Sequence, residues 1–251
     1  MMFSEEVAWV TGSSTGIGAA SAVALADAGC RVAVHYNRSE DEAREVVEGI
    51  RSSGGEAMLV GGDVADAGEV ERMAGEIEDR YGRLDVLVNN AGSLIERRSF
   101  SEIAEDLWDR VMDVNLKSVF LCSQAVLPTM KRRSKGRIIN VTSVAARNGG
   151  GPGSAAYATA KGGVSTLTRA MAKELVSDNI LVNGVAPGVI TTPFHERFTP
   201  PEVRERMTAG IPIGREGTPE EVAGAVVFLA SPAADYLVGE IIEVNGGQLM
   251  S

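Results

Sequence analysis

Tyr157 and Lys161 lie four residues apart in Ala155–Val176, a stretch with helical spacing. Residues at i and i+4 share one face of a helix, so the phenol and the ammonium group are expected to lie close together. A free tyrosine has a pKa near 10, about three units too high for easy proton exchange at pH 7. A nearby cation lowers the pKa of a phenol, and three units correspond to about 4 kcal/mol. The spacing therefore predicts an acid/base pair in which Tyr157 carries the proton.

A glycine-rich segment near the N-terminus predicts a second kind of site. It begins at Thr11, reads T-G-S-S-T-G-I-G, and separates a strand-like run, Val7–Val10, from a helical pattern, Ala19–Ala28. Glycines allow a tight turn, and a helix N-terminus offers free N–H groups and the positive end of the dipole. This chemistry fits the pyrophosphate of a dinucleotide, although a purely structural turn has a similar pattern. The residues expected to contact the cofactor here are Gly12, Ser14, Thr15, Gly16, Ile17 and Gly18.

The end of the second strand is expected to lie near the adenosine ribose of that dinucleotide. An acidic residue there binds the 2′-hydroxyl of NAD, whereas a basic residue accommodates the 2′-phosphate of NADP. The segment after the strand contains Asn37 and Arg38 and no carboxylate before Glu40. Arg38 is able to form a charge-assisted fork to a phosphate, so NADP(H) is favoured and NAD(H) is the alternative. An exposed loop position for Arg38 is the other interpretation.

The elements that must position these residues alternate along the chain. Short apolar runs predict strands, and longer segments with helical spacing lie between them. This order predicts an α/β fold in which one doubly wound domain, residues 1–251, has a parallel sheet with helices on both faces. The predicted strands are Val7–Val10, Arg31–His35, Ala57–Val60, Leu84–Val88, Arg137–Val141, Ile180–Val185 and Ile241–Val244. The predicted helices are Ala19–Ala28, Glu40–Arg51, Ala67–Tyr81, Glu105–Met130, Ala155–Val176 and Pro219–Leu229.

Two loops differ from the rest. Arg147–Ser154 is too rich in glycine for the interior of an element and predicts a mobile turn. The segment 191–212 contains four prolines around a short helical stretch, Glu202–Thr208, and predicts a lid over a site. The apolar side chains of this lid are Phe194, Phe198 and Met207.

Composition excludes several classes of function. A net charge of −10 argues against a nucleic-acid binder. No apolar run is long enough for a membrane span, and the N-terminus lacks the basic region of a signal peptide, so a cytoplasmic location is expected. Cys30 and Cys122 are expected to be buried thiols, no cluster has the spacing of metal ligands, and His35 and His195 are expected in packing or surface roles.

Five motifs occur in a fixed order: T-G-x-x-x-G-I-G, Asn89-Asn90-Ala91-Gly92, Ser143, Tyr157-x-x-x-Lys161 and Pro187-Gly188. In this order the chain resembles the short-chain dehydrogenase/reductase family over essentially its whole length. The resemblance implies a Rossmann-like sheet of seven parallel strands and a homotetramer or homodimer. It also implies hydride transfer between a nicotinamide cofactor and a carbonyl or secondary alcohol.

The same resemblance assigns site residues. The catalytic residues fall on Asn115, Ser143, Tyr157 and Lys161. Ser143 would donate a hydrogen bond to the substrate oxygen, Lys161 would also bind the nicotinamide ribose, and Asn115 would hold a water linked to the lysine. Further cofactor contacts fall on Asp63, Val64, Asn90, Ala91, Gly92, Pro187, Gly188, Val189 and Thr192, and Tyr157 and Lys161 also touch the cofactor. Thr15 stands where many NADP-preferring members have a basic residue.

The resemblance leaves the substrate open, with a small carbonyl or alcohol as the expected partner. Similar patterns occur in 3-oxoacyl-acyl-carrier-protein reductases and in glucose dehydrogenase-like members. Acyl carrier protein is acidic and needs basic residues beside the site, yet Asp178 follows the Tyr157 helix. The carrier is thus a possible but not favoured partner, with Arg132 and Arg133 left for docking. A catalytically silent NADP-sensing regulatory protein is the alternative of another class, and the intact Ser143, Tyr157 and Lys161 argue against it.

Overall fold

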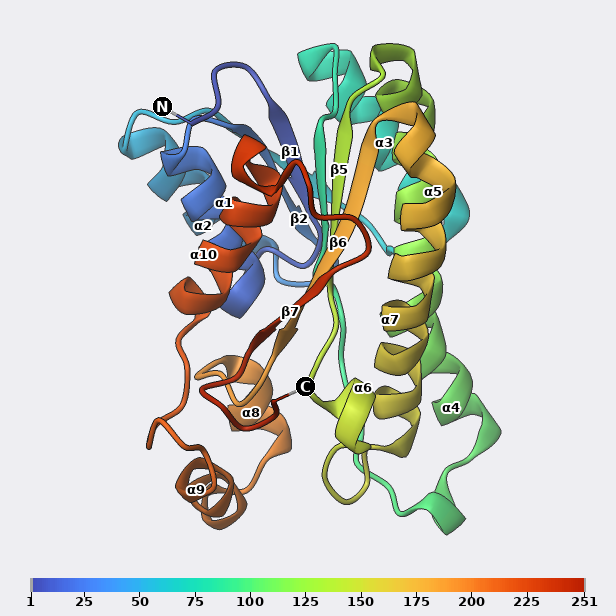
Figure 1. The fold of residues 1–251 in the computed structure, drawn as a ribbon, viewed down its shortest axis with the longest axis vertical. Coiled ribbons are helices and arrows are strands. Elements are labelled where there is room, and N and C mark those ends of the chain that lie inside the picture. The colour runs from blue at the N-terminus through green and yellow to red at the C-terminus, as the bar shows by residue number, and fades with distance from the viewer. Residues whose placement is uncertain (1, 251) are drawn as a thin grey trace.

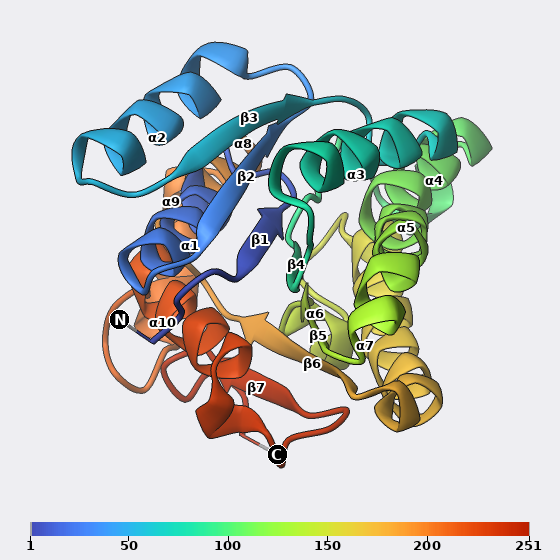
Figure 2. The same ribbon diagram turned by 90° about the horizontal axis from the view of Figure 1, so that it is seen from above.

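A sheet of seven parallel strands forms the centre of the computed structural model, which describes residues 2–250. The strands lie in the order β3-β2-β1-β4-β5-β6-β7, as Figure 2 shows from above. Their bounds are β1 Val7–Val10, β2 Arg31–Tyr36, β3 Ala57–Gly61, β4 Val86–Asn89, β5 Gly136–Val141, β6 Ile180–Pro187 and β7 Ile241–Val244. All seven predicted strands are confirmed, with ends that move by up to two residues.

The start of β4 shows why one boundary moved. Leu84 was predicted as the first strand residue, but β4 begins at Val86. The Asp85 carboxylate accepts the backbone N–H of Val7 at 2.9 Å and two hydrogen bonds from the Arg83 guanidinium at 2.7 and 2.8 Å. This buried side-chain network occupies the residues just before the strand.

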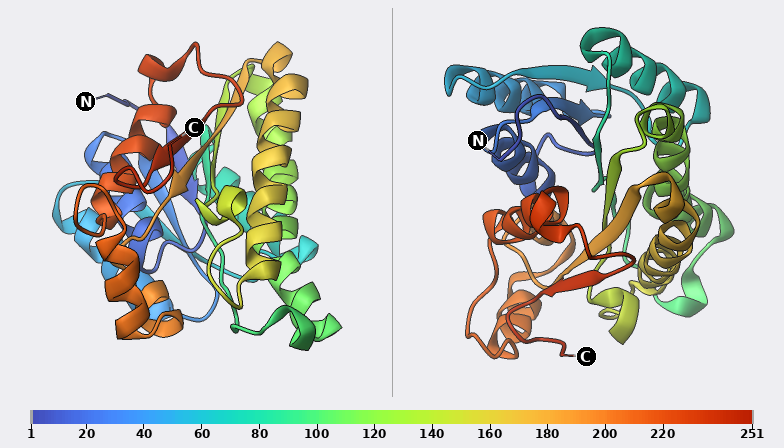
Figure 3. Two further views of the ribbon diagram at one scale, coloured as in Figure 1. Left: turned by 60° about the horizontal axis from the view of Figure 1, so that its bottom comes forward. Right: turned by 45° about the horizontal axis from the view of Figure 1, so that its top comes forward.

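Helices cover both faces of the sheet (Figures 1 and 3). On one face lie α1 (Gly16–Asp27), α2 (Glu40–Ser52) and α10 (Pro219–Ala230). On the other face lie α3 (Ala67–Tyr81), α5 (Ser118–Arg133) and α7 (Ala155–Leu175), with α4 (Glu105–Met112) packed against α7. The doubly wound architecture is therefore confirmed. Short helices at η1 (Phe100–Glu102), η3 (Val176–Asp178) and η4 (Pro232–Ala234) complete the turns.

Two predicted helical segments have a different form in the structure. The stretch Glu105–Met130 was predicted as one helix, but a π-helical turn, η2 (Asp113–Lys117), separates α4 from α5. The lid segment contains two helices, α8 (Pro193–Phe198) and α9 (Pro201–Ala209), where one was predicted. The first two residues of the predicted mobile turn belong to α6 (Ala145–Asn148). At the lower end of the view in Figure 1, α6, α8 and α9 lie below the sheet.

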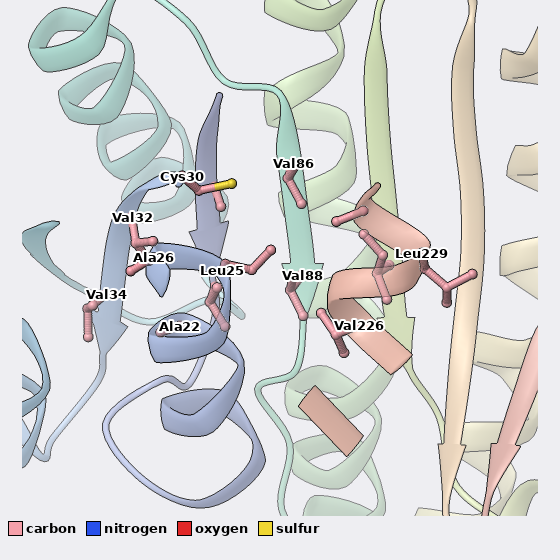
Figure 4. Close-up of a cluster of buried hydrophobic side chains, with 14 of the residues drawn as sticks. Ala22, Leu25, Ala26, Cys30, Val32, Val34, Val86, Val88, Val226 and Leu229 are labelled. Atoms are coloured by element: carbon pink, nitrogen blue, oxygen red, sulfur yellow. The ribbon is translucent and has the colours of Figure 1, made fainter. Parts of the chain in front are cut away.

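The apolar core lies on both faces of the sheet, which explains the uninterrupted apolar runs. In β1, Ala8 and Val10 belong to the cluster under α1 and α10, while Val7 and Trp9 belong to the cluster on the opposite face. Figure 4 shows the first cluster between α1, α10 and the neighbouring strands, with Leu25 at its centre. Burial of each large aliphatic side chain contributes roughly 1.5–3 kcal/mol.

Two further sequence-level expectations are addressed by the structure. No helix within residues 2–250 combines the length and apolarity needed to cross a membrane. Cys30 and Cys122 are free and buried, as predicted, and burial raises the pKa of each thiol to about 12. The side chain of His195 lies outside the part of the chain that the structure describes.

His35 connects the glycine-rich turn to the neighbouring strands. Its side chain is 1% exposed; Nδ1 accepts the Gly12 N–H at 2.8 Å, and Nε2 lies 3.0 Å from the Gly62 carbonyl oxygen. These partners fit a neutral imidazole with its proton on Nε2. Its own backbone N–H donates to Oγ of Ser13, and Ser13 N–H donates back to the His35 carbonyl. Burial lowers the pKa of His35 to about 4, so the neutral form holds the turn in place.

This clamp predicts a loss of stability in mild acid. The pKa of His35 is 6.5 without perturbation and about 4 in the folded chain, so the unfolded state binds more protons between these values. The contribution of His35 to the free energy of unfolding is therefore fully present above pH 6.5. It falls by about 3 kcal/mol as the pH drops to 4. Urea unfolding of the chain and of His35→Asn, at one protein concentration and several pH values, measures the difference. Parallel pH profiles for the two proteins would contradict the neutral clamp.

Candidate active site

A cavity of about 650 Å³ opens at the carboxyl ends of the central strands. In a parallel sheet the crevice lies where the strand order reverses, here between β1 and β4. The residues expected at the site from sequence that line it are Gly12, Ser14, Thr15, Gly16, Ile17, Gly18, Asn37, Arg38, Val64, Asn90, Ala91, Gly92, Ser143, Tyr157, Lys161, Pro187, Gly188, Val189 and Thr192. Asp63 and Asn115 do not line the cavity. Asp63 lies beside Val64, where its carboxylate accepts the Ala65 N–H at 2.9 Å.

Close backbone packing shapes the glycine turn. Gly12 has a φ of +62°, and a Cβ at Gly18 would lie 2.2 Å from the Gly12 carbonyl oxygen. The Asn90 amide donates to the carbonyls of Thr11 and Gly12 at 2.9 Å. In turn, the Thr11 hydroxyl accepts the N–H groups of Asn90 and Ala91 at 3.0 Å. The loop after β4 thus fixes the turn after β1, and Thr11 has a role that sequence reasoning missed.

The N-terminus of α1 is open to an anion. Thr15 is the N-cap residue, its side chain makes no capping hydrogen bond, and the first turn contains no acidic residue. The free N–H groups and the helix dipole therefore point to a phosphate-binding function. Arg38 is exposed at the same part of the cavity, while nearby Glu40 pairs with Arg44 at 2.6 Å. Arg38 is thus exposed on the wall of the cavity.

Ser143, Tyr157 and Lys161 meet at the other part of the cavity. Ser143 follows β5, and α7 presents the other two from one face. The Ser143 hydroxyl accepts the Ala145 N–H at 3.1 Å and lies close enough to Tyr157 to lower the pKa of the phenol. Lys161 Nζ lies 5.8 Å from the centre of the Tyr157 ring and donates to the Val141 carbonyl at 2.8 Å. The i, i+4 prediction that phenol and ammonium lie close together is confirmed.

In the chain alone the pKa of Tyr157 is raised, and its expected lowering by Lys161 together with an oxidised nicotinamide stays a prediction. Burial raises the pKa of Tyr157 to about 12, and the hydrogen bond from Ser143 offsets only part of the increase. Burial also lowers the pKa of Lys161 to about 8. The Lys161 ammonium lies over the ring of Tyr157 and donates to the Val141 carbonyl, and desolvation is the largest influence on the Tyr157 pKa. Tyr157 is consequently held in its protonated form at neutral pH.

Asn115 lies beneath the cavity in the π-helical turn. Its amide donates to the carbonyls of Ser93 at 2.7 Å and Val111 at 2.8 Å, and its oxygen accepts the Ser93 N–H at 3.1 Å. A Cβ at Gly92 would lie 2.7 Å from the Asn115 oxygen and 3.3 Å from Lys161 Nζ. Asn115 thus supports the loop that separates it from the lysine. Its expected role with a water stays a prediction.

The substrate side of the cavity contains residues that sequence reasoning did not single out, above all Arg97 and Leu94. Of the predicted lid side chains, Phe194 and Met207 line the cavity. The Phe194 ring lies 5.7 Å from the Tyr157 ring and 5.2 Å from the Phe198 ring. Arg97 follows the Asn-Asn-Ala-Gly motif, and this position could have indicated that it lies near the site. Its hydrogen-bond partners, Phe198 and Pro152, are far away in the sequence and could not have been predicted from it.

Comparisons with known proteins agree over nearly the whole chain. The family model described as enoyl-(acyl carrier protein) reductase matches residues 12–248. A 3-oxoacyl-[acyl-carrier-protein] reductase of Synechocystis sp. is 46% identical over 246 residues, which cover 98% of this chain and 97% of the relative. A reductase of the same name from Staphylococcus aureus is 44% identical, covering 97% of this chain and 98% of the relative.

Solved structures show the same architecture. A putative gluconate dehydrogenase from Agrobacterium tumefaciens superposes with a TM-score of 0.94 at 34% identity, covering 99% of this chain and 97% of that one. A putative NAD(P)-dependent gluconate 5-dehydrogenase from Beutenbergia cavernae, with bound NADP, has a TM-score of 0.93 at 37% identity and covers 99% and 98%. With these matches and this site, the chain belongs to the short-chain dehydrogenase/reductase family of oxidoreductases.

Proposed function

We propose that this chain is an NADP(H)-dependent reductase of ketone-type carbonyl groups, with Tyr157 as the proton donor. The observation that carries the proposal is the shared cavity, in which the glycine turn and Arg38 lie with Ser143, Tyr157 and Lys161. An extended dinucleotide can contact both groups of residues, with its phosphates at the glycine turn and its reactive ring beside Tyr157.

The residues present fit an NADP cofactor. The open N-terminus of α1 suits the pyrophosphate, and the exposed Arg38 suits a 2′-phosphate. The Pro187–Thr192 segment, at the end of β6, is positioned to hold the nicotinamide carboxamide. Bound cofactor supplies the hydride in the reducing direction. The solved relative with bound NADP supports the same choice.

The side chains of the chain itself supply the proton and orient the carbonyl. Tyr157 carries its proton in the chain alone, where its pKa lies near 12. Donation of this proton to the carbonyl oxygen requires a lower pKa, which the positive charge of Lys161 and a bound cofactor would favour. Ser143 lines the cavity beside Tyr157, which supports a role in binding the same oxygen. The buried ammonium of Lys161 favours the negative charge that develops on Tyr157 after proton transfer. The helices α8 and α9 are proposed to cover the substrate, because Phe194 and Met207 line the cavity.

A 3-oxoacyl group on acyl carrier protein is the second candidate substrate, and the names of the curated relatives favour it. Arg132 forms an ion pair with Glu78, and Arg133 lies 3.7 Å from the Asp85 carboxylate. Both side chains remain partly exposed, at 58% and 40%, so the expectation that they are left for docking a carrier stays a prediction. A free small molecule remains the first candidate, and a homotetramer or homodimer in the cytoplasm remains the proposed working form.

Arg38 is predicted to set the cofactor preference. Arg38→Ala removes a charge-assisted pair with the 2′-phosphate, so the Kd for NADPH should rise about 10- to 100-fold while that for NADH changes little. Fluorescence titration with both cofactors measures this difference. Arg44→Ala is the matched control, because Arg44 pairs with Glu40 and does not line the cavity. Equal affinities for the two cofactors in the unaltered chain would contradict the assignment.

Tyr157 is predicted to carry the proton in the reduction. Tyr157→Phe should lower kcat by about 100-fold or more, because a general acid contributes roughly that much, and it should leave NADPH binding within a few-fold. Tyr81→Phe is the control, since Tyr81 is a buried tyrosine outside the cavity. A Tyr157→Phe variant with near-normal kcat would rule out this acid.

Lys161 is predicted to set the alkaline limit of the reaction. Its pKa of about 8 means that the ammonium form dominates below this pH and is lost above it. The rate of reduction at saturating NADPH should therefore be level near pH 6.5–7.5 and decline as the pH rises through about 8. A pH profile of kcat for the carbonyl substrate measures this decline. A flat profile up to pH 10 would show that the charge of Lys161 is not required.

A further inference from the structure

The wall of the cavity is cationic in a strongly acidic protein. The chain has a net charge of −10, yet among the described residues none that lines the cavity is Asp or Glu. Its charged lining residues are Arg38, Arg97 and Lys161. The proposed cofactor accounts for Arg38, and the proton transfer accounts for Lys161. Arg97 is left without a function.

Arg97 lies between the two loops that border the substrate side of the cavity. Its Nε donates to the carbonyl of Phe198 at 2.6 Å, and its Nη1 donates to the carbonyl of Pro152 at 3.0 Å. A Cβ at Gly153 would lie 3.1 Å from Cβ of Arg97, so the glycine-rich loop packs directly on this side chain. Arg97 therefore joins the loop before α7 to the end of α8.

The guanidinium of Arg97 is desolvated without a neutralising partner. Partial burial lowers the pKa of Arg97, and in residues 2–250 no ion pair joins it to a carboxylate. A guanidinium has five N–H donors, and the two backbone carbonyls engage two of its three nitrogen atoms. The remaining nitrogen, Nη2, retains N–H donors, and a charged N–H group forms strong hydrogen bonds to the oxygen of a carboxylate or a phosphate. By contrast, the neighbouring Arg98 is exposed and pairs with Glu96 at 2.5 Å.

Aromatic contacts place Arg97 at the reactive end of the cavity. The Phe198 residue that accepts from Arg97 packs against Phe194, whose ring lies 5.7 Å from the Tyr157 ring. Two residues in contact, Phe194 and Phe198, thus connect the proposed proton donor to the guanidinium. Arg38, by comparison, follows β2 beside the glycine turn. Arg97 and Tyr157 line the same cavity.

We infer that Arg97 is a specificity-determining residue that binds an anionic group, a carboxylate or a phosphate, on the carbonyl substrate. This inference rests on the proposed function and narrows it to carbonyl compounds that carry such a group. A partly dehydrated cation in a wall without carboxylates favours an anion and makes a neutral analogue a poorer ligand.

The test compares matched substrates with NADPH as the reductant. One pair is 3-oxobutanoate and its methyl ester, which differ in the carboxylate; the other is dihydroxyacetone phosphate and dihydroxyacetone, which differ in the phosphate. At least one anionic member should have a kcat/KM about 10-fold or more above that of its neutral partner. The pair that shows the preference identifies the anion. Equal or better turnover of both neutral members would overturn the inference and leave the proposed function standing, whereas no turnover of any of the four would count against the proposed function itself.

Variants separate binding of the anion from a structural role. Arg97→Gln should lower the ratio of kcat/KM for the anionic over the neutral member about 10- to 100-fold, and Arg97→Lys should restore part of that ratio. Arg98→Gln, which alters an exposed neighbour outside the cavity, should leave the ratio unchanged. If Arg97→Gln slows both members equally, Arg97 only supports the two loops and the inference is wrong.

Discussion

The site depends on the burial of one cation. Lys161 is 3% exposed, and its ammonium group has a backbone carbonyl, that of Val141, as a hydrogen-bond partner. Removing a cation from water is costly, so the surrounding structure must hold it in place. Gly92 leaves room beside Nζ, and Asn115 fixes the loop that contains this glycine. The same desolvation that costs stability makes the charge effective toward an electron-rich group, because its field is weakly screened.

The distribution of charge separates the cavity from the rest of the surface. Acidic residues outnumber basic ones by 34 to 24 in the chain. Among the described residues, however, no Asp or Glu lines the cavity. A cationic cleft within an acidic molecule concentrates anions locally and repels them elsewhere. A phosphate-rich cofactor benefits from this pattern at Arg38 and at the N-terminus of α1. The pattern extends to Arg97, where the cofactor's phosphates are not expected.

Sequence patterns predicted those parts of the fold and the site that depend on local spacing. The seven strands were found because both faces of the sheet are covered, which produces continuous apolar runs. The shared face of Tyr157 and Lys161 was found because four residues form about one helical turn. The raised pKa of Tyr157 in the chain alone was not predicted, since it depends on how deeply the packed chain buries the phenol. The contact between Arg97 and Phe198 joins residues 101 positions apart, and no local pattern encodes it.

The π-helical turn shows how a local irregularity serves the site. The sequence pattern across Asp113–Lys117 is compatible with a regular α-helix. In the structure this segment is a π-helix, in which each backbone hydrogen bond spans one more residue than in an α-helix. The widening directs the Asn115 amide to the backbone of Ser93, in the loop after β4. That loop also contains Asn90, which fixes the glycine turn, and it leads to Arg97. One segment thus connects the proposed phosphate site, the buried lysine and the proposed substrate cation, and Asn115 holds that segment through the backbone of Ser93.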